Sequence, residues 1–151
     1  YFAAHNSAFE CQFLGDLEHR RIICTYKSAL RVFPDAPSHS NFGLAYWLED
    51  QGRISFDPVT AQPAHRAGPD AYVTAHILKA LFDAGATGRE MVAWTREPAM
   101  LPTCPIGTPW RGKKWPEVDA GFLRWMANNP TMEADYKWNA IRELERRESI
   151  K

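Results

Sequence analysis

Apolar residues occur along the chain in two patterns, short uninterrupted runs near the start and longer stretches with helical spacing after them. Tyr1–Ala4 and Arg21–Tyr26 are short apolar runs of the kind that forms buried strands. Between them, Asn6 or Ser7 can cap a helix that runs to about Leu17. The beginning of the chain therefore predicts strand, helix, strand.

Helical spacing dominates the rest of the chain, and Pro and Gly interrupt it. The clearest helix is predicted from Pro69 to Ala84, because Ala71, Ala75, Leu78 and Phe82 form an apolar stripe with helical spacing. Five other helices are predicted. One ends at about Phe33, and one starts at a Thr87 cap and ends at Trp94. The remaining three cover Asn41–Glu49, Val118–Ala127 and Glu133–Arg147. Strands among so many helices indicate an α/β fold.

Breaks in these patterns suggest how the chain is organised. We expect residues 1–85 to form one domain and residues 110–151 a small, mostly helical module. Residues 86–109 would be a short helix and an extended linker, since four prolines lie between Pro98 and Pro109. The chain starts at Tyr1 with an apolar segment, so we expect it to lack its natural beginning.

Composition and charge exclude several classes of protein. The 151 residues carry 18 basic and 18 acidic side chains, which argues against a polybasic nucleic-acid binder but leaves room for a local basic patch. No apolar run is long enough for a transmembrane helix, so no membrane partner is expected. The three cysteines are far apart and form no Cys-x-x-Cys pair, which favours a reducing cytoplasm.

Glu10 is the first candidate for chemistry, and it has a plain structural alternative. Ser7-x-x-Glu10 is the pattern of a capping box, in which each side chain bonds the backbone amide of the other residue. From this segment alone, the capping role is favoured over a metal ligand.

His65 and Asp70 form a second candidate, just before the clearest helix. Pro69 suits a first helical turn, and Asp70 then lies at the positive end of the helix dipole, where a carboxylate is stabilised. An imidazole beside an ionised carboxylate can serve a metal-dependent hydrolase as base and ligand. The alternative is a dipole-matched Asp70 and a solvated loop His65, and locally this alternative is favoured.

The third candidate is the basic, aromatic turn Trp110–Trp115. Arg111, Lys113 and Lys114 can neutralise phosphates, and Trp110 and Trp115 can stack on bases. The alternative is a Gly112 turn whose tryptophans pack on Phe122 and Trp125, and it is favoured because tryptophans in small chains usually fill the core.

Taken together, these segments resemble the DnaQ-like superfamily of DEDD-type 3′–5′ exonucleases, in its exodeoxyribonuclease X branch. Ala-His-Asn-Ser-Ala-Phe-Glu (residues 4–10) is similar to the family's second motif, and His65–Asp70 with its alanine-rich helix is similar to the third motif of the subclass that uses His as base, termed DEDDh. Further segments also resemble the family, so that the likeness extends over nearly the whole chain: Ile22–Arg31, Asn41–Ala45, Pro98–Met100, Gly121–Trp125 and, as weaker evidence, Arg111–Lys113.

Two features depart from the family pattern. The first motif, an Asp-x-Glu on the first strand, is absent, and Glu10 stands where the family has Asp. The resemblance implies a ribonuclease H-like fold, of which this chain would supply the second half without the N-terminal strands. The exposed sheet edge that results would invite oligomerisation.

The resemblance also implies a function. Family members hydrolyse the terminal phosphodiester at a 3′ end with two divalent ions, here Mg²⁺ or Mn²⁺. Glu10 and Asp70 would be metal ligands, His65 the general base, and Asn6, Arg111, Lys113 and Lys114 contacts to nucleic acid. The expected partner is DNA, as single strands or 3′ ends, with RNA as the other option.

An incomplete ligand set predicts weak or absent activity for this chain by itself. The rival interpretation is a non-catalytic relic of such a nuclease, which binds nucleic acid or another protein.

Overall fold

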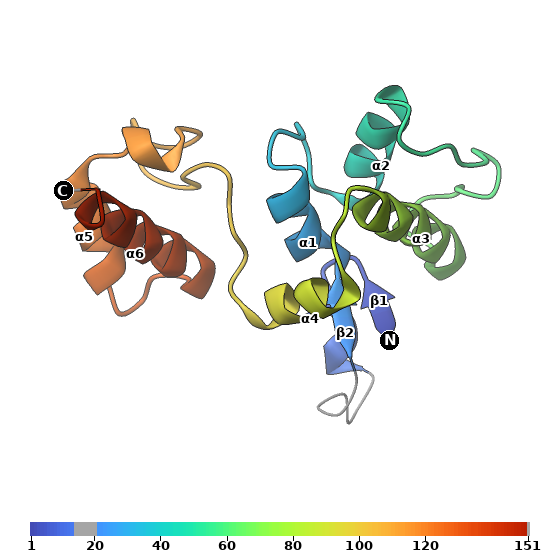
Figure 1. The fold of residues 1–151 in the computed structure, drawn as a ribbon, viewed down its shortest axis with the longest axis horizontal. Helices are drawn as coiled ribbons and strands as arrows, with labels where there is room; N and C mark the ends of the chain where they lie inside the picture. Colours follow the sequence, from blue (N-terminus) through green and yellow to red (C-terminus); the bar gives the residue numbers. More distant parts are fainter. Residues whose placement is uncertain (14–20, 151) are drawn as a thin grey trace. The chain divides into compact units, whose positions relative to one another are not determined.

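The computed structural model describes residues 1–13 and 21–150 as two compact units, Tyr1–Glu97 and Pro98–Lys151 (Figure 1). Unit 1 contains a two-stranded parallel sheet, in which β1 (Phe2–Ala4) pairs with β2 (Ile22–Cys24). Phe2 lies opposite Ile22 and Ala4 opposite Cys24. The predicted α/β class and both predicted strands are confirmed.

The described part of unit 1 also contains the helices α1 (Thr25–Val32), α2 (Asn41–Asp50), α3 (Ala67–Asp83) and α4 (Gly88–Arg96). In Figure 1, α4 lies against β2 and α2 beside α3, and the structure also packs α3 on β1. The N-termini of α2 and α4 are capped by the side chain of a hydroxyl residue, as is common at helix starts. Ser40 accepts from the Gly43 amide, and Thr87 forms a complete capping box with Glu90.

The buried face of α3 differs from the predicted stripe. Val73, Ile77 and Leu81 are fully buried, whereas Ala71, Ala75 and Phe82 are exposed. Apolar residues lie on both sides of this helix, so spacing alone does not choose between the faces. Contact with α2 and β1 selects the face that carries the larger branched side chains.

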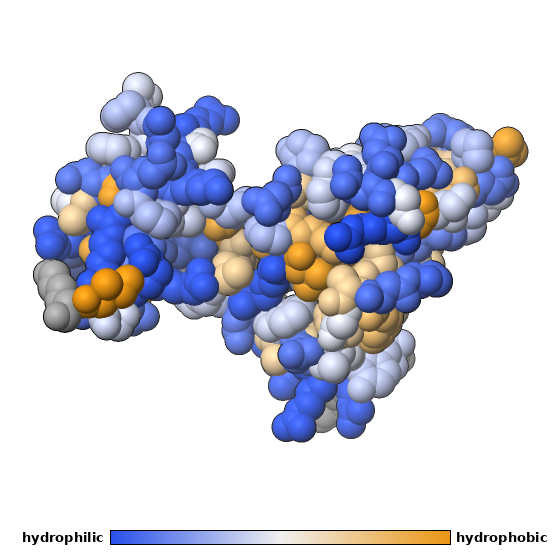
Figure 2. Space-filling model, turned by 45° about the horizontal axis from the view of Figure 1, so that its top comes forward, coloured by the Kyte–Doolittle hydropathy of each residue, from blue (hydrophilic) through white to orange (hydrophobic). Residues whose placement is uncertain are grey.

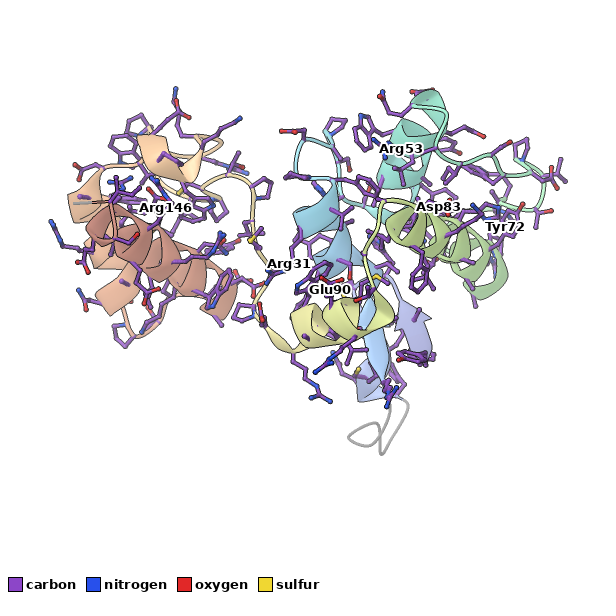
Figure 3. All side chains as sticks on the ribbon, in the orientation of Figure 1. Arg31, Arg53, Tyr72, Asp83, Glu90 and Arg146 are labelled. Carbon is purple, nitrogen blue, oxygen red and sulfur yellow. The ribbon has the colours of Figure 1, made fainter. Side chains whose placement is uncertain are left out.

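The loop between α2 and α3 contacts α3 and the end of α1. The Asp57 amide donates to the Tyr72 hydroxyl over 3.0 Å, and the Arg53 guanidinium lies 5.4 Å from the centre of the Phe33 ring. Figure 3 labels Arg53 and Tyr72 on this part of unit 1, and it also labels Arg31, whose ion pair with Glu97 joins α1 to the end of α4.

Unit 2 consists of a loop region, the 3₁₀ helix η2 (Trp115–Glu117), α5 (Ala120–Asn128) and α6 (Ala134–Glu148). The α5 and α6 helices pack against each other. Its core is formed by Cys104, Trp115, Val118, Leu123, Met126 and Ala140. Burial raises the pKa of the Cys104 thiol, as expected of a core residue.

The short helix predicted after Thr87 is present as α4, but residues 86–109 do not form a separate linker. The α4 helix belongs to unit 1, where it packs on α1 and β2. Residues 98–109 belong to unit 2, because Cys104 is fully buried in its core and Thr103 forms an antiparallel bridge with Lys114. Prolines remove backbone donors but do not prevent a segment from packing.

The helix predicted from Asn6 or Ser7 to Leu17 is also wrong where the structure describes it. Residues 5–9 form turns, and only the short 3₁₀ helix η1 (Glu10–Gln12) follows. Residues 14–17 of the predicted helix lie outside the described residues. Asn6 adopts a left-handed conformation with φ of 62°, which a helix N-cap does not use.

The surface of the molecule mixes hydrophilic and hydrophobic residues. On the face shown in Figure 2, hydrophobic patches are bordered by hydrophilic side chains. Large exposed hydrophobic side chains include Phe9, Phe13 and Val59. None of the helices in the described ranges combines the length and the apolar character needed to cross a membrane.

Candidate functional site

At the start of α3, His65 and Asp70 are linked through the backbone of His65. His65 has a left-handed backbone, with φ of 63°, and its amide donates to Asp70 Oδ1 over 3.0 Å. The Asp70 amide in turn donates to the carbonyl of Arg66, the N-cap, over 2.9 Å. The carboxylate thus fixes the backbone at His65 and leaves the imidazole exposed to solvent.

Asn41 holds this turn in place from the start of α2. Its Nδ2 donates to the Asp70 carbonyl over 3.1 Å, and its Oδ1 accepts from the Thr74 hydroxyl over 3.3 Å. Both groups of one amide therefore link α2 to α3. Sequence analysis assigned Asn41 no such role, and only its position at a helix start, where an amide side chain can reach a neighbouring element, could have indicated one.

Glu10 lies on η1, after the end of β1, and it does not form the predicted capping box. Its Oε2 is buried and has no hydrogen-bond partner among residues 1–13 and 21–150, and no side chain caps η1. Instead, backbone bonds from Phe9 to Asn6 and from Cys11 to Ser7 build the turn. The Glu10 carboxylate therefore lacks the hydrogen bond from a backbone amide that a capping box would supply.

Asn6 and Asn41 share one surface hollow of ≈ 490 Å³, which is also lined by His5, Tyr26, His39 and Ser40. His5 is held by Thr25 Oγ1 at 3.0 Å and by the His39 carbonyl at 2.8 Å. Burial lowers the pKa of His5, so the ring is neutral near pH 7. The hollow thus contains the neutral ring of His5 and includes Asn41, the residue that positions Asp70.

A complete metal centre is not formed by the part of the chain that the structure describes. Within it, no group of three or more His, Cys, Asp or Glu side chains could hold a metal ion. The His65 amide bonds to Asp70, and Asn6 and Asn41 line the same hollow. The predicted cations Arg111, Lys113 and Lys114 belong to unit 2.

The tryptophans of the basic turn in unit 2 follow the favoured alternative, in which they pack into the unit rather than stack on bases. Trp115 is 7% exposed and donates from Nε1 to the Leu101 carbonyl over 2.7 Å, so it is a core residue and offers no stacking face. Trp110 is half-buried and packs on Phe122. Arg111, Lys113 and Lys114 are exposed, as a phosphate contact requires.

Comparison with known proteins gives one relationship, found in two strains. The chain is 31% identical over 133 residues to exodeoxyribonuclease 10 of Escherichia coli K12, and equally to that of E. coli O6:H1. The alignment covers 85% of this chain and 57% of each relative. No protein-family model matches the chain, and no solved structure matches it. The chain is thus similar over most of its length to a curated exodeoxyribonuclease and spans little more than half of that protein.

Proposed function

We propose that this chain is part of a DnaQ-like 3′–5′ exonuclease of the DEDDh type, with a ribonuclease H-like fold. The observation that carries the proposal is the pairing of His65 with Asp70 at the start of α3, beside a parallel strand pair. The similarity to exodeoxyribonuclease 10 supports the same function. The substrate is DNA with a 3′ end, and the place of action is the cytoplasm.

Glu10 and Asp70 carry the oxygen donors that a hard divalent ion, Mg²⁺ or Mn²⁺, prefers. Glu10 has a buried oxygen that no described group satisfies, and a cation would satisfy it. The Asp70 carboxylate accepts one backbone amide and keeps further lone pairs for a ligand. When bound, the ion supplies charge stabilisation for the phosphoryl oxygens.

His65 acts as the general base. Its imidazole nitrogen takes a proton from the attacking water, and the exposed ring can reach a substrate-bound water. The hydrogen bond from its amide to Asp70 orients the backbone that carries the ring. Asn6 contacts the substrate from the shared hollow, and Arg111, Lys113 and Lys114 bind its phosphates.

The test is cleavage of a 5′-labelled single-stranded DNA by the full-length protein in Mg²⁺. Asp70→Asn removes the ligand charge with little change of volume, and we expect it to abolish most of the shortening from the 3′ end. Asp83→Asn, which changes an exposed acid at the other end of the same helix, is the control and keeps activity. Near-normal turnover in Asp70→Asn would refute the assignment.

His65→Ala separates the base from the metal ligands. Loss of a positioned base costs about 10²- to 10⁴-fold in turnover. We expect that loss, together with a flattened pH–rate profile, while the affinity for Mn²⁺ stays unchanged. A variant with the wild-type pH–rate profile would exclude His65 as base.

The rival function, a non-catalytic relic, is favoured by one observation. The bond from the His65 amide gives Asp70 a structural role that needs no metal ion. If the relic is correct, the wild-type protein binds DNA but neither takes up Mn²⁺ nor shortens the strand.

A further inference from the structure

Unit 2 carries a row of aromatic rings that ends at the solvent. Phe122 and Trp125, one helical turn apart on α5, are stacked with ring centres 5.3 Å apart and planes at 29°. Trp110 continues the row, 6.4 Å from Phe122. Trp125 is 52% exposed, although Leu123 and Met126 beside it on α5 are fully buried. One face of Trp125 is thus covered by Phe122, and much of the ring is open to water.

The surroundings of Trp125 are polar and cationic. An open hollow of ≈ 410 Å³ beside it is lined by Arg124, Asn128, Asn129 and Pro130. This combination of a stacking face, hydrogen-bonding groups and positive charge is complementary to a nucleotide.

The turn from Gly107 to Gly112 adds one cation, Arg111, next to Trp110 of the aromatic row. Gly107 has φ of +83°, and a Cβ there would lie 2.4 Å from the Phe122 ring, so the backbone approaches the ring as only glycine allows. Trp110, on this turn, contacts Phe122, and Arg111 is exposed beside it. The turn therefore holds Arg111 near one end of the row, while Arg124 lies at the other.

The nearby carboxylates do not cancel this charge pattern. Asp119 accepts the amides of Gly121 and Phe122 as the cap of α5. Glu117 accepts the Lys114 amide over 2.9 Å. Both acids are thus engaged with backbone amides, which compensate part of their charge.

We propose that Trp125 is a base-stacking site of unit 2 for single-stranded DNA, with Arg124 at the adjoining phosphate. The choice of DNA rests on the proposed function, but the binding itself needs no metal and no cleavage. The site lies on α5 and not between Trp110 and Trp115, where the sequence offered base stacking as the less favoured option. Phe122 supports the ring from behind, so a base that stacks on the open face meets a ring already fixed in place.

The experiment measures binding of a fluorescein-labelled oligothymidine of about 15 nucleotides by anisotropy, with EDTA present. A second probe of equal length has abasic sites throughout, so it keeps the phosphates and lacks the bases. Trp125→Ala should weaken binding of oligothymidine about tenfold, with little effect on the abasic probe, because only stacking is lost. Trp125→Phe keeps an aromatic face and should bind within about threefold of wild type.

Two controls make the result specific. Tyr46→Ala removes an exposed aromatic from unit 1 and should leave both affinities unchanged. Arg124→Gln should weaken both probes and lower the salt dependence of binding, whereas Arg142→Gln, the same charge change on α6, should not. Ala is favourable in a helix, so Trp125→Ala should fold, which thermal unfolding checks.

Wild-type affinity of Trp125→Ala for oligothymidine would overturn the proposal, as would an equal loss on both probes or no binding by the wild-type protein. These outcomes are separate from the proposed nuclease. A protein that binds through Trp125 but never shortens DNA refutes the nuclease alone, and an active nuclease indifferent to Trp125→Ala refutes the stacking site alone.

Discussion

One carboxylate oxygen of Glu10 is buried without a hydrogen-bond partner among the described residues. A buried carboxylate oxygen without a partner costs about 1–3 kcal/mol or more, and Glu10 Oε2 has none among the described residues. The Ser7-x-x-Glu10 pattern predicts a capping box, but the pattern is equally compatible with the turns that the structure shows. The sequence therefore singles out Glu10 through an apparent capping box, whereas the structure singles it out through a buried oxygen that no described group satisfies.

Gly107 and Gly112 form a matched pair for testing close packing. Both have φ of +83°, so an Ala is equally strained at either position, but only at Gly107 would its Cβ meet Phe122, at 2.4 Å. We expect Gly107→Ala to destabilise unit 2 by about 1–3 kcal/mol more than Gly112→Ala, measured by urea unfolding. Equal losses would mean that Phe122 moves aside freely.

At the level of elements, most strands and helices could be predicted, because apolar runs, caps and prolines act locally. Thr87 with Glu90 is an example, since the capping box is written in adjacent residues. The buried face of α3 could not be predicted, because Ala71 and Val73 begin stripes of equal spacing. Packing against other elements decides between such stripes, and no local pattern contains that information.

The link between α2 and α3 depends on one amide, and a double-mutant cycle tests it. Asn41→Ala removes two hydrogen bonds and should cost about 2 kcal/mol, whereas Thr74→Val removes one and should cost about 1 kcal/mol. In the double variant the shared bond is counted once, so the two costs should fall short of additivity by about 1 kcal/mol. Additive losses in urea unfolding would show that Thr74 and Asn41 do not interact.

At the level of the whole molecule, unit 2 is stabilised by a buried charge on α6. The Glu143 side chain is 5% exposed and pairs with Arg146, labelled in Figure 3, and with Arg147. Arg147 also donates to the carbonyls of Trp115, Pro116 and Val118, which ties α6 to η2. Sequence spacing predicts the pairing on one helix, but not that the carboxylate is buried.

This charge predicts a pH dependence of stability. Hydrogen bonds from Arg146 are the main cause that lowers the pKa of Glu143 below its ordinary 4.5. A lowered pKa in the folded state means that the stabilisation is complete above pH 4.5 and is lost as the pH falls below it. Glu143→Gln should therefore cost about 2 kcal/mol at pH 7 and progressively less in acid.

Thermal unfolding at pH 7 and at a pH below 4.5 measures the effect. Asp83→Asn breaks an exposed pair with Lys79 and should cost under about 0.5 kcal/mol at either pH. A Glu143→Gln variant as stable as wild type at pH 7 would contradict the proposed role of the buried pair.

The candidate site could be predicted as far as its residues, but not its geometry. His65 and Asp70 are close in sequence, so their pairing follows from the start of one helix. The Asn41 link and the unsatisfied oxygen of Glu10 depend on elements far apart in the chain, which no spacing reveals. Two carboxylates also hold a pair of divalent ions poorly, because the ions repel each other.

The most direct measurement is uptake of Mn²⁺ by the full-length protein, followed by the loss of the free-ion signal in electron paramagnetic resonance. The proposal predicts that the wild-type protein binds Mn²⁺, that Glu10→Gln and Asp70→Asn each weaken binding at least tenfold, a difference of about 1.4 kcal/mol, and that Asp83→Asn binds as wild type does. No uptake by the wild-type protein, or unchanged uptake in both site variants, would contradict the assignment of Glu10 and Asp70 as metal ligands.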